Sequence, residues 1–173
     1  MAENEENNEA AAAAGPTTQQ QEGPAFALQR IYLKDISFES PRSPAVFQGK
    51  WEPKINFDIK TKHNKIQDDV YEVVLVLTAE AKMDDEAAFL VEVQQAGIFF
   101  VVGIEGEALR QVLATVGPNI LFPYARESID ALVVKGGFPP LMLAPVNFEA
   151  LYRQAVASQA QQEAAGQVES DAT

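Results

Sequence analysis

The sequence predicts an α+β fold, in which a four-stranded antiparallel sheet is followed by helices that pack on one of its faces. The first observation is order, because four segments with strand character precede every helical pattern in the chain. The second is the short turn at Asp84-Asp85, which is typical of an antiparallel hairpin. The third is a helical pattern near residue 120 that is apolar on more than one side, so a partner as well as the sheet should cover it.

The predicted strands span residues 25–40, 53–62, 70–82 and 86–102. In the first strand the apolar character drifts from one face to the other, which indicates a bulge or a two-sided contact. The second strand alternates cleanly, with Ile55, Phe57 and Ile59 on one face and charged residues on the other. The fourth is apolar on both faces, which favours burial on both sides.

Two helices are predicted after the last strand. The first should end at Pro118, because proline lacks the N–H that a helix interior needs. The second should begin near Asn119, since Pro123 is tolerated in a first turn, and Gly136 should end it. A last helix should begin after Asn147, which is a favourable N-cap residue.

That last helix should fray after about residue 158. The chain is therefore predicted to have three regions. Residues 1–24 form an acidic N-terminal tail, residues 25–157 form the folded domain, and residues 158–173 form a second acidic tail. Both tails are rich in Ala, Gln and Glu without a packed apolar pattern, so we expect them to be disordered. The chain has a formal net charge of -12, and the two tails supply -8 of it.

Composition narrows the classes of function. The chain has 173 residues, no cysteine and 47% hydrophobic residues, which fits one domain with a sizeable core and a reducing compartment. Its acidity disfavours binding to nucleic acid or anionic membranes, because phosphate contacts require Lys and Arg. No apolar run is long enough to span a membrane, and the N-terminal stretch lacks the features of a signal peptide. We therefore expect a cytoplasmic protein.

The residues that could carry catalysis or a metal give no coherent set. His63 is the only histidine and is expected in a surface turn, without a nucleophile or a second ligand beside it. Gly103 and Gly106 stand where phosphate loops sit but lack the third glycine and the Lys of nucleotide motifs, so they indicate helix–strand packing. We expect no enzyme activity, no metal and no cofactor.

Two other groups suggest binding surfaces. Asp35, Glu39 and Glu92 lie within otherwise apolar strands, where they form either a charged sheet edge or an acidic docking face. The second group consists of large apolar residues near the proline-flanked connection 41–53, and it forms either core or a groove for extended apolar peptide. Its members are Phe38, Phe47, Trp51, Ile55, Phe57 and Ile59.

Several longer segments make a resemblance specific. They are RIYLKDISFESP, DDVYEVVLVLTAEA, AFLVEVQQAGIF, GIEG, PNILFPYARESI and FPPLMLAPVNFEALY. These segments closely resemble the SecB family of protein-export chaperones from about Phe26 to Tyr152. The resemblance implies an ATP-independent chaperone that holds unfolded precursor proteins and passes them to the translocation ATPase SecA. It also implies a homotetramer, assembled as a dimer of dimers.

The resemblance also implies roles for individual positions. Matching the family's SecA-docking positions are Asp35, Glu39, Leu90 and Glu92. Matching strand positions linked to assembly are Val91, Val93 and Gln95, and we add Ile120 and Tyr124 of the apolar helix as oligomer contacts. The alternative is an assembly adaptor of the same fold that docks through its acidic face without holding clients. The segment 1–24 is longer than the ordinary family tail, and its role stays open.

Overall fold

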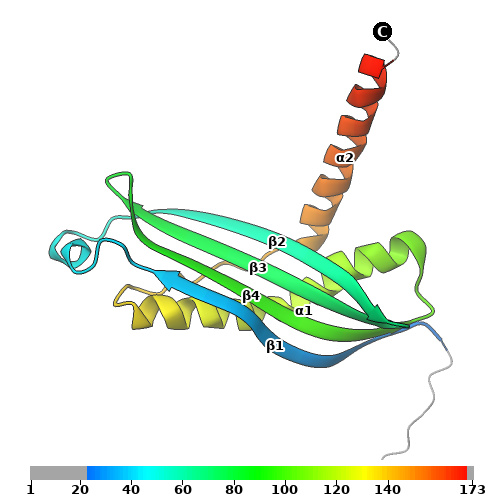
Figure 1. Ribbon diagram of the computed structural model, residues 1–173, viewed down its shortest axis with the longest axis horizontal. Helices are drawn as coiled ribbons and strands as arrows, with labels where there is room; N and C mark the ends of the chain where they lie inside the picture. Colours follow the sequence, from blue (N-terminus) through cyan, green and yellow to red (C-terminus); the bar gives the residue numbers. More distant parts are fainter. Residues whose placement is uncertain (1–22, 171–173) are drawn as a thin grey trace, which may run out of the picture.

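The computed structural model describes the backbone of residues 23–170 and the side chains of residues 23–161. It confirms the α+β class, with one antiparallel sheet followed by helices, but only α1 lies along a sheet face, whereas α2 contacts α1 and projects away from the sheet (Figure 1). The elements, in chain order, are β1 (Ala25–Glu39), the short 3₁₀ helix η1 (Ala45–Gln48), β2 (Lys54–Gln67), β3 (Val70–Met83), β4 (Glu86–Val102), α1 (Gly106–Lys135) and α2 (Phe148–Ser170).

The sheet has the order β1-β4-β3-β2, so β3 and β4 are central and the other two strands form its edges. All neighbours pair antiparallel. Asp84 and Asp85 make the β3–β4 turn with positive φ angles of 53° and 63°, which Asp adopts more readily than most residues. In β1 the pairing register shifts between Leu28 and Arg30 and again between Leu33 and Asp35, and these two irregularities explain the drift of apolar character along that strand.

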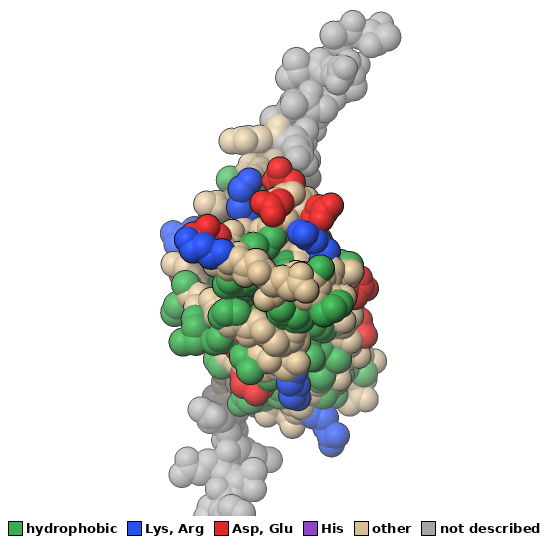
Figure 2. Space-filling model, turned by 90° about the vertical axis from the view of Figure 1, so that its left-hand side faces the viewer, with side chains coloured by type: hydrophobic (Ala, Val, Ile, Leu, Met, Phe, Trp, Pro, Cys, Tyr) green, Lys and Arg blue, Asp and Glu red, His purple; other side chains and the backbone are tan. Residues whose placement is uncertain are grey.

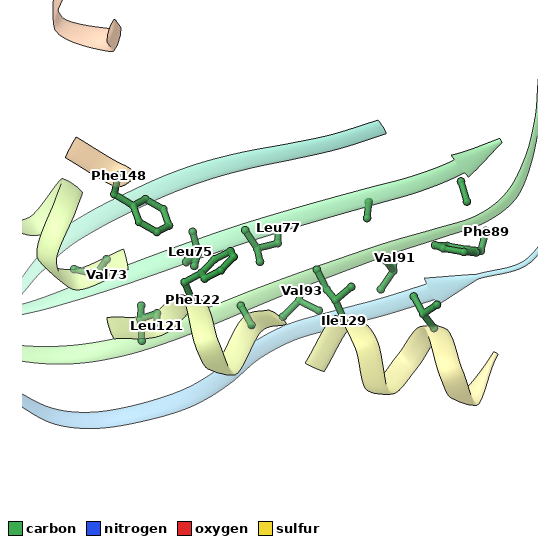
Figure 3. Close-up of a cluster of buried hydrophobic side chains, with 14 of the residues drawn as sticks. Val73, Leu75, Leu77, Phe89, Val91, Val93, Leu121, Phe122, Ile129 and Phe148 are labelled. Atoms are coloured by element: carbon green, nitrogen blue, oxygen red, sulfur yellow. The ribbon is translucent and has the colours of Figure 1, made fainter. Parts of the chain in front are cut away.

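The core lies between the sheet and α1, which runs under one sheet face (Figure 1). We call this the inner face and the opposite one the outer face. Side chains of β3 and β4 alternate between them, and the fully buried inner-face residues include Leu75, Phe89, Val91 and Val93. From α1, residues such as Ile129 point back toward the strands (Figure 3). Full burial of such side chains is the main stabilising contribution.

The prediction of two helices separated at Pro118 is wrong, because α1 is one helix of 30 residues that contains both Pro118 and Pro123. Tertiary packing overrides the local preference. Pro118 is fully buried, and Gly117 brings the helix close to β3, where an added Cβ would stand 3.0 Å from a methyl of Val73. Figure 1 shows that the helix changes direction along its length, as expected for internal prolines.

Two other bounds differ from the prediction. β2 continues to Gln67, so His63 lies within a strand, exposed, and not in a turn. The helix α2 continues to Ser170, beyond the fraying expected near residue 158. The predicted N-terminal tail lies almost wholly outside the described residues. No described helix is long and apolar enough to cross a membrane.

Candidate binding surfaces

Five aromatic rings gather at the end of the molecule where η1 and the β3–β4 turn lie. We call them the aromatic cluster: Phe38 of β1, Phe47 of η1, Trp51, Phe89 of β4 and Phe138 after α1. Phe138 is the hub, with ring centroids 4.9 Å from Phe89 and 5.1 Å from both Trp51 and Phe47. Phe89 is fully buried, whereas Phe47 is 51% exposed, so the cluster runs from the core to the surface.

The end of α1 positions Phe138. The helix closes with backbone N–H groups of Gly136 and Phe138 donating to carbonyls of the last turn, at 2.8 and 3.1 Å. Gly137 has a φ of 87°, a conformation that favours glycine. A Cβ on Gly136 would overlap the Phe38 ring, so the glycine pair also permits the close approach of helix and strand.

An apolar row on β2 continues from this cluster. Ile55, Phe57 and Ile59 pair with inner-face residues of β3, which places them on the inner face beside α1. Ile55 is 42% exposed and Phe57 is 37% exposed, whereas Ile59 packs against the core. Seen from the η1 end, hydrophobic side chains cover much of the surface, with charged side chains around the border (Figure 2). The six residues predicted from the sequence thus form one graded surface.

The predicted acidic group is brought together on the outer face. Glu39 of β1 pairs with Leu90 of β4, and two residues along the strands Ser37 pairs with Glu92. Asp35 lies two residues further along β1 and faces the same side of the sheet. All four predicted docking positions therefore point away from α1, and the inner-face aromatic cluster lies on the other side of the sheet.

The acidic area is wider than the sequence indicated. Thr78 of the neighbouring strand β3 donates to a Glu92 carboxylate oxygen at 3.2 Å, and Gln94 of the same strand as Glu92 donates to the other oxygen at 3.0 Å, so two hydrogen bonds hold this carboxylate in place. Beside Leu90 the surface has a hollow of about 200 Å³. It is lined by Asn56, Phe57, Asp58, Thr78, Glu80 and Leu90. An apolar side chain of a basic partner would fit such a hollow.

At its other end the outer face carries three basic side chains around one buried acid, and the adjoining β2–β3 turn carries Asp68, which is paired with Lys65, and Asp69. Glu72 is buried there, and Lys34 donates to its two oxygens at 2.7 and 2.8 Å while the Tyr32 hydroxyl also donates to it. Burial raises the pKa of Glu72, but the Lys34 and Tyr32 hydrogen bonds outweigh burial, so the net pKa is lowered. Burial and the Glu72 carboxylate raise the pKa of Tyr32 to about 12. Arg30 and Lys62 stand exposed on either side.

The lowered pKa of Glu72 gives a pH-dependent stability. The carboxylate stabilises the fold above its unfolded pKa, and this contribution is lost as the pH falls through the folded pKa. We expect Glu72→Gln to lower the free energy of unfolding by about 1–2 kcal/mol at neutral pH and by much less near pH 3. Urea unfolding at the two pH values and fixed protein concentration measures this. Glu80→Gln is the control, and an equal loss at both pH values would contradict the assignment.

The predicted oligomer contacts divide into two groups. Tyr124 is 51% exposed on α1, and Ile120 is partly buried one turn before it. Val91 and Val93 are instead fully buried beneath α1, in the core of the chain itself. Gln95 is also buried, and its side-chain amide donates to the Tyr32 carbonyl at 2.8 Å. Only the helix residues therefore offer surface to a second copy directly.

Comparison with known proteins agrees with this architecture. The family model described as preprotein translocase subunit SecB matches residues 19–159. The protein-export protein SecB of Marinobacter nauticus is 58% identical over 153 residues, covering 88% of this chain and 92% of the relative. The chain belongs to the SecB family. The SecB of Hahella chejuensis is 59% identical over 142 residues, covering 82% of this chain and 89% of that protein.

A solved structure gives the same fold. The SecB-like chaperone of Mycobacterium tuberculosis, determined in complex with a ChAD peptide from an antitoxin, superposes with a TM-score of 0.57 at 19% identity. The match covers 70% of this chain and 87% of that one. As a SecB-family member, this chain is a protein-export chaperone, and the resemblance seen in its sequence is confirmed.

Two residues of the aromatic cluster were not identified from the sequence. Phe89 and Phe138 complete the aromatic cluster but were not among the predicted groove residues. Phe89 shares an alternating pattern with Val91 and Val93, which indicated its face of the sheet but not its aromatic neighbours. Phe138 follows a glycine pair that marks a helix end, yet only the fold shows that this end meets β1 and η1.

Proposed function

We propose that this chain is an ATP-independent holdase, which binds unfolded precursor proteins in the cytoplasm and delivers them to the SecA ATPase. The observation that carries the proposal is the graded apolar surface on the inner face, which runs from a buried floor to exposed rings. Monomeric proteins rarely leave such surface uncovered without a binding role. The membership of a protein-export family fits an unfolded precursor as the occupant.

The surface suits an extended apolar chain. Phe47, Ile55 and Phe57 are each more than a third exposed and present a line of apolar side chains along η1 and β2. β2 is an edge strand, so its outward N–H and C=O groups are available to pair with an extended segment. Folded proteins do not present such a segment, and selection for unfolded clients follows.

The acidic outer face is the proposed dock for SecA. Glu39, Leu90 and Glu92 combine two carboxylates with an apolar hollow, and this combination fits a basic segment that carries an apolar residue. The carboxylates of this dock and the client surface lie on opposite sides of the sheet, and the two surfaces share only Phe57 of the edge strand β2. A client that does not cover Phe57 would therefore leave the dock open to the ATPase.

The proposed assembly is a dimer of dimers, in which exposed apolar residues of α1 contact another copy. Val116 is 40% exposed, Tyr124 51% and Val134 54%, and they lie along a helix whose other side is buried against the sheet. Burial against a second copy would remove this surface from water. An unfolded chain that wraps several copies gains affinity from each contact.

The test has three measurements, all without nucleotide: native mass by light scattering, binding to purified SecA, and suppression of the aggregation of a chemically unfolded protein. The proposal expects a particle near four times the 18.9 kDa chain that takes up the unfolded protein and keeps it in solution. A tetramer that binds SecA but leaves the client to aggregate would favour the adaptor alternative. A monomer that binds neither would overturn both readings.

Trp51→Ala tests the client surface directly. Trp51 is partly buried against Phe138 and Phe89, so its removal should weaken client binding roughly tenfold while the protein remains folded. Titration of a labelled unfolded peptide measures the affinity, and thermal melting measures the stability. Ile66→Ala, an exposed apolar residue at the far end of β2, is the matched control. Unfolding of Trp51→Ala at room temperature would assign Trp51 to the core instead.

A further inference from the structure

We propose that the acidic N-terminal segment, residues 1–22, docks on the basic end of the outer face of the same chain. The basic end consists of Arg30, Lys34 and Lys62, which lie around the buried Glu72. The segment contains five glutamates and no Lys or Arg. This inference goes beyond the proposed chaperone function and does not depend on it.

The exit point of the segment lies at the same end of the sheet. Pro24 packs against Gly103. A Cβ added to Gly103 would stand 3.2 Å from the Cα of Pro24. Ala25 then pairs with Val102 at the start of β1. The basic end is reached from there by moving along β1 to Arg30, whereas the acidic area around Glu39 lies at the opposite end of the strand.

The segment is long enough to reach it. Tyr32 lies seven residues along β1 from Ala25. Lys62 of β2 lies in the same row of paired residues as Tyr32, three strands away across Ala96 and Val74. With a rise of ~3.3 Å per residue and a strand spacing of ~4.8 Å, the separation of Lys62 from Ala25 is roughly 27 Å. Four glutamates lie between Glu3 and Glu9, and a chain of 14 residues back from Gly23 can span roughly 45 Å.

The charges are complementary. Lys34 is already paired with Glu72, but Arg30 and Lys62 have no acidic partner within 4.0 Å among the described side chains. Each exposed ion pair contributes little by itself. A covalent tether, however, gives the segment an effective concentration on the order of millimolar, so a weak attraction is enough to populate the docked state. Docking would place further carboxylates beside Asp35 and extend the acidic area along the outer face.

The test is zero-length carbodiimide cross-linking of the full-length chain, which joins only carboxylates and amines in contact. The proposal expects cross-links from Glu3–Glu9 to Lys62 or Lys34 in low salt, falling at least fivefold in 0.5 M NaCl. Arg30→Gln, which keeps both target lysines, should lower the yield about two- to threefold. Lys135→Gln, at the end of α1, is the matched control and should leave it unchanged.

A second measurement uses the absence of cysteine. A spin label on Asn8→Cys would be the only modified thiol, and it should broaden the amide signals of Val74 and Ala96 more than those of α1. Cross-links spread equally over Lys50, Lys54 and Lys135, together with no selective broadening, would overturn the proposal. So would cross-links to Lys62 whose yield does not change with salt or with Arg30→Gln.

Discussion

Replacing Phe89 by alanine is expected to lower the free energy of unfolding by about 3–5 kcal/mol, the largest effect of any single substitution considered. Phe89 is fully buried, and its ring lies 5.8 Å from Phe38, 6.2 Å from Trp51 and 4.9 Å from Phe138 between centroids. Its removal would leave a cavity beneath three rings that themselves hold η1 and the end of α1 in place. Chemical unfolding at fixed protein concentration measures the loss.

Phe100→Ala is the matched control for this prediction. Phe100 lies on the same strand but is 37% exposed on the outer face, so we expect a loss of about 1 kcal/mol or less. Under conditions in which Phe89→Ala remains folded, it should also bind clients more weakly, because the Phe89 ring forms the floor of the client surface. Equal destabilisation by the two substitutions would show that Phe89 is not the anchor of the aromatic cluster.

The double reversal Glu39→Lys and Glu92→Lys is expected to weaken SecA binding roughly 10- to 100-fold while client holding is unchanged. Both carboxylates lie on the outer face and flank Leu90, whereas the client surface lies on the inner face. Two cations in their place would repel a basic partner. Affinity for SecA, measured over a range of salt concentrations, and suppression of client aggregation are the two readouts.

Glu105→Lys with Glu149→Lys is the control for net charge, since it changes the total by the same amount at the start of α1 and of α2. It should leave SecA affinity near that of the unmodified protein, and salt should weaken binding of the unmodified protein more than binding of the double reversal. Equal loss of both activities in the outer-face variant would contradict the separation of the two surfaces.

Strands and their faces were predictable because period-two patterns are local. Ile55, Phe57 and Ile59 lie on one face of β2 as predicted, and Asp35, Glu39 and Glu92 meet on the outer face. The end of β2 was not predictable, because the residues after Lys62 are polar except for Ile66, so they show no alternating pattern, and their strand conformation comes from pairing with β3. Edge-strand length is therefore set by the neighbouring strand.

The aromatic cluster could be predicted only in part, because some of its contacts join residues that are far apart in the sequence. Phe38, Phe47 and Trp51 could be identified as a group because they are close in the sequence, at the end of β1 and in the connection that follows it. Phe138 joins the cluster from a position 87 residues after Trp51, and no local sequence pattern predicts that contact. Likewise, the sequence does not distinguish whether Val91 and Val93 are covered by a helix of the same chain or by a helix of another copy, because both kinds of burial require the same apolar residues.

The two prolines of α1 also have a consequence for its motions. Pro118 and Pro123 have no N–H, so the carbonyls of Ala114 and Asn119 lack their helical donors. The middle of the helix is thus its weakest point, and the turns on either side can open as separate cooperative units. The later unit ends at Gly136 against Phe38, so amide exchange in residues 124–135 should report on the aromatic cluster, independently of the turns that precede Pro118.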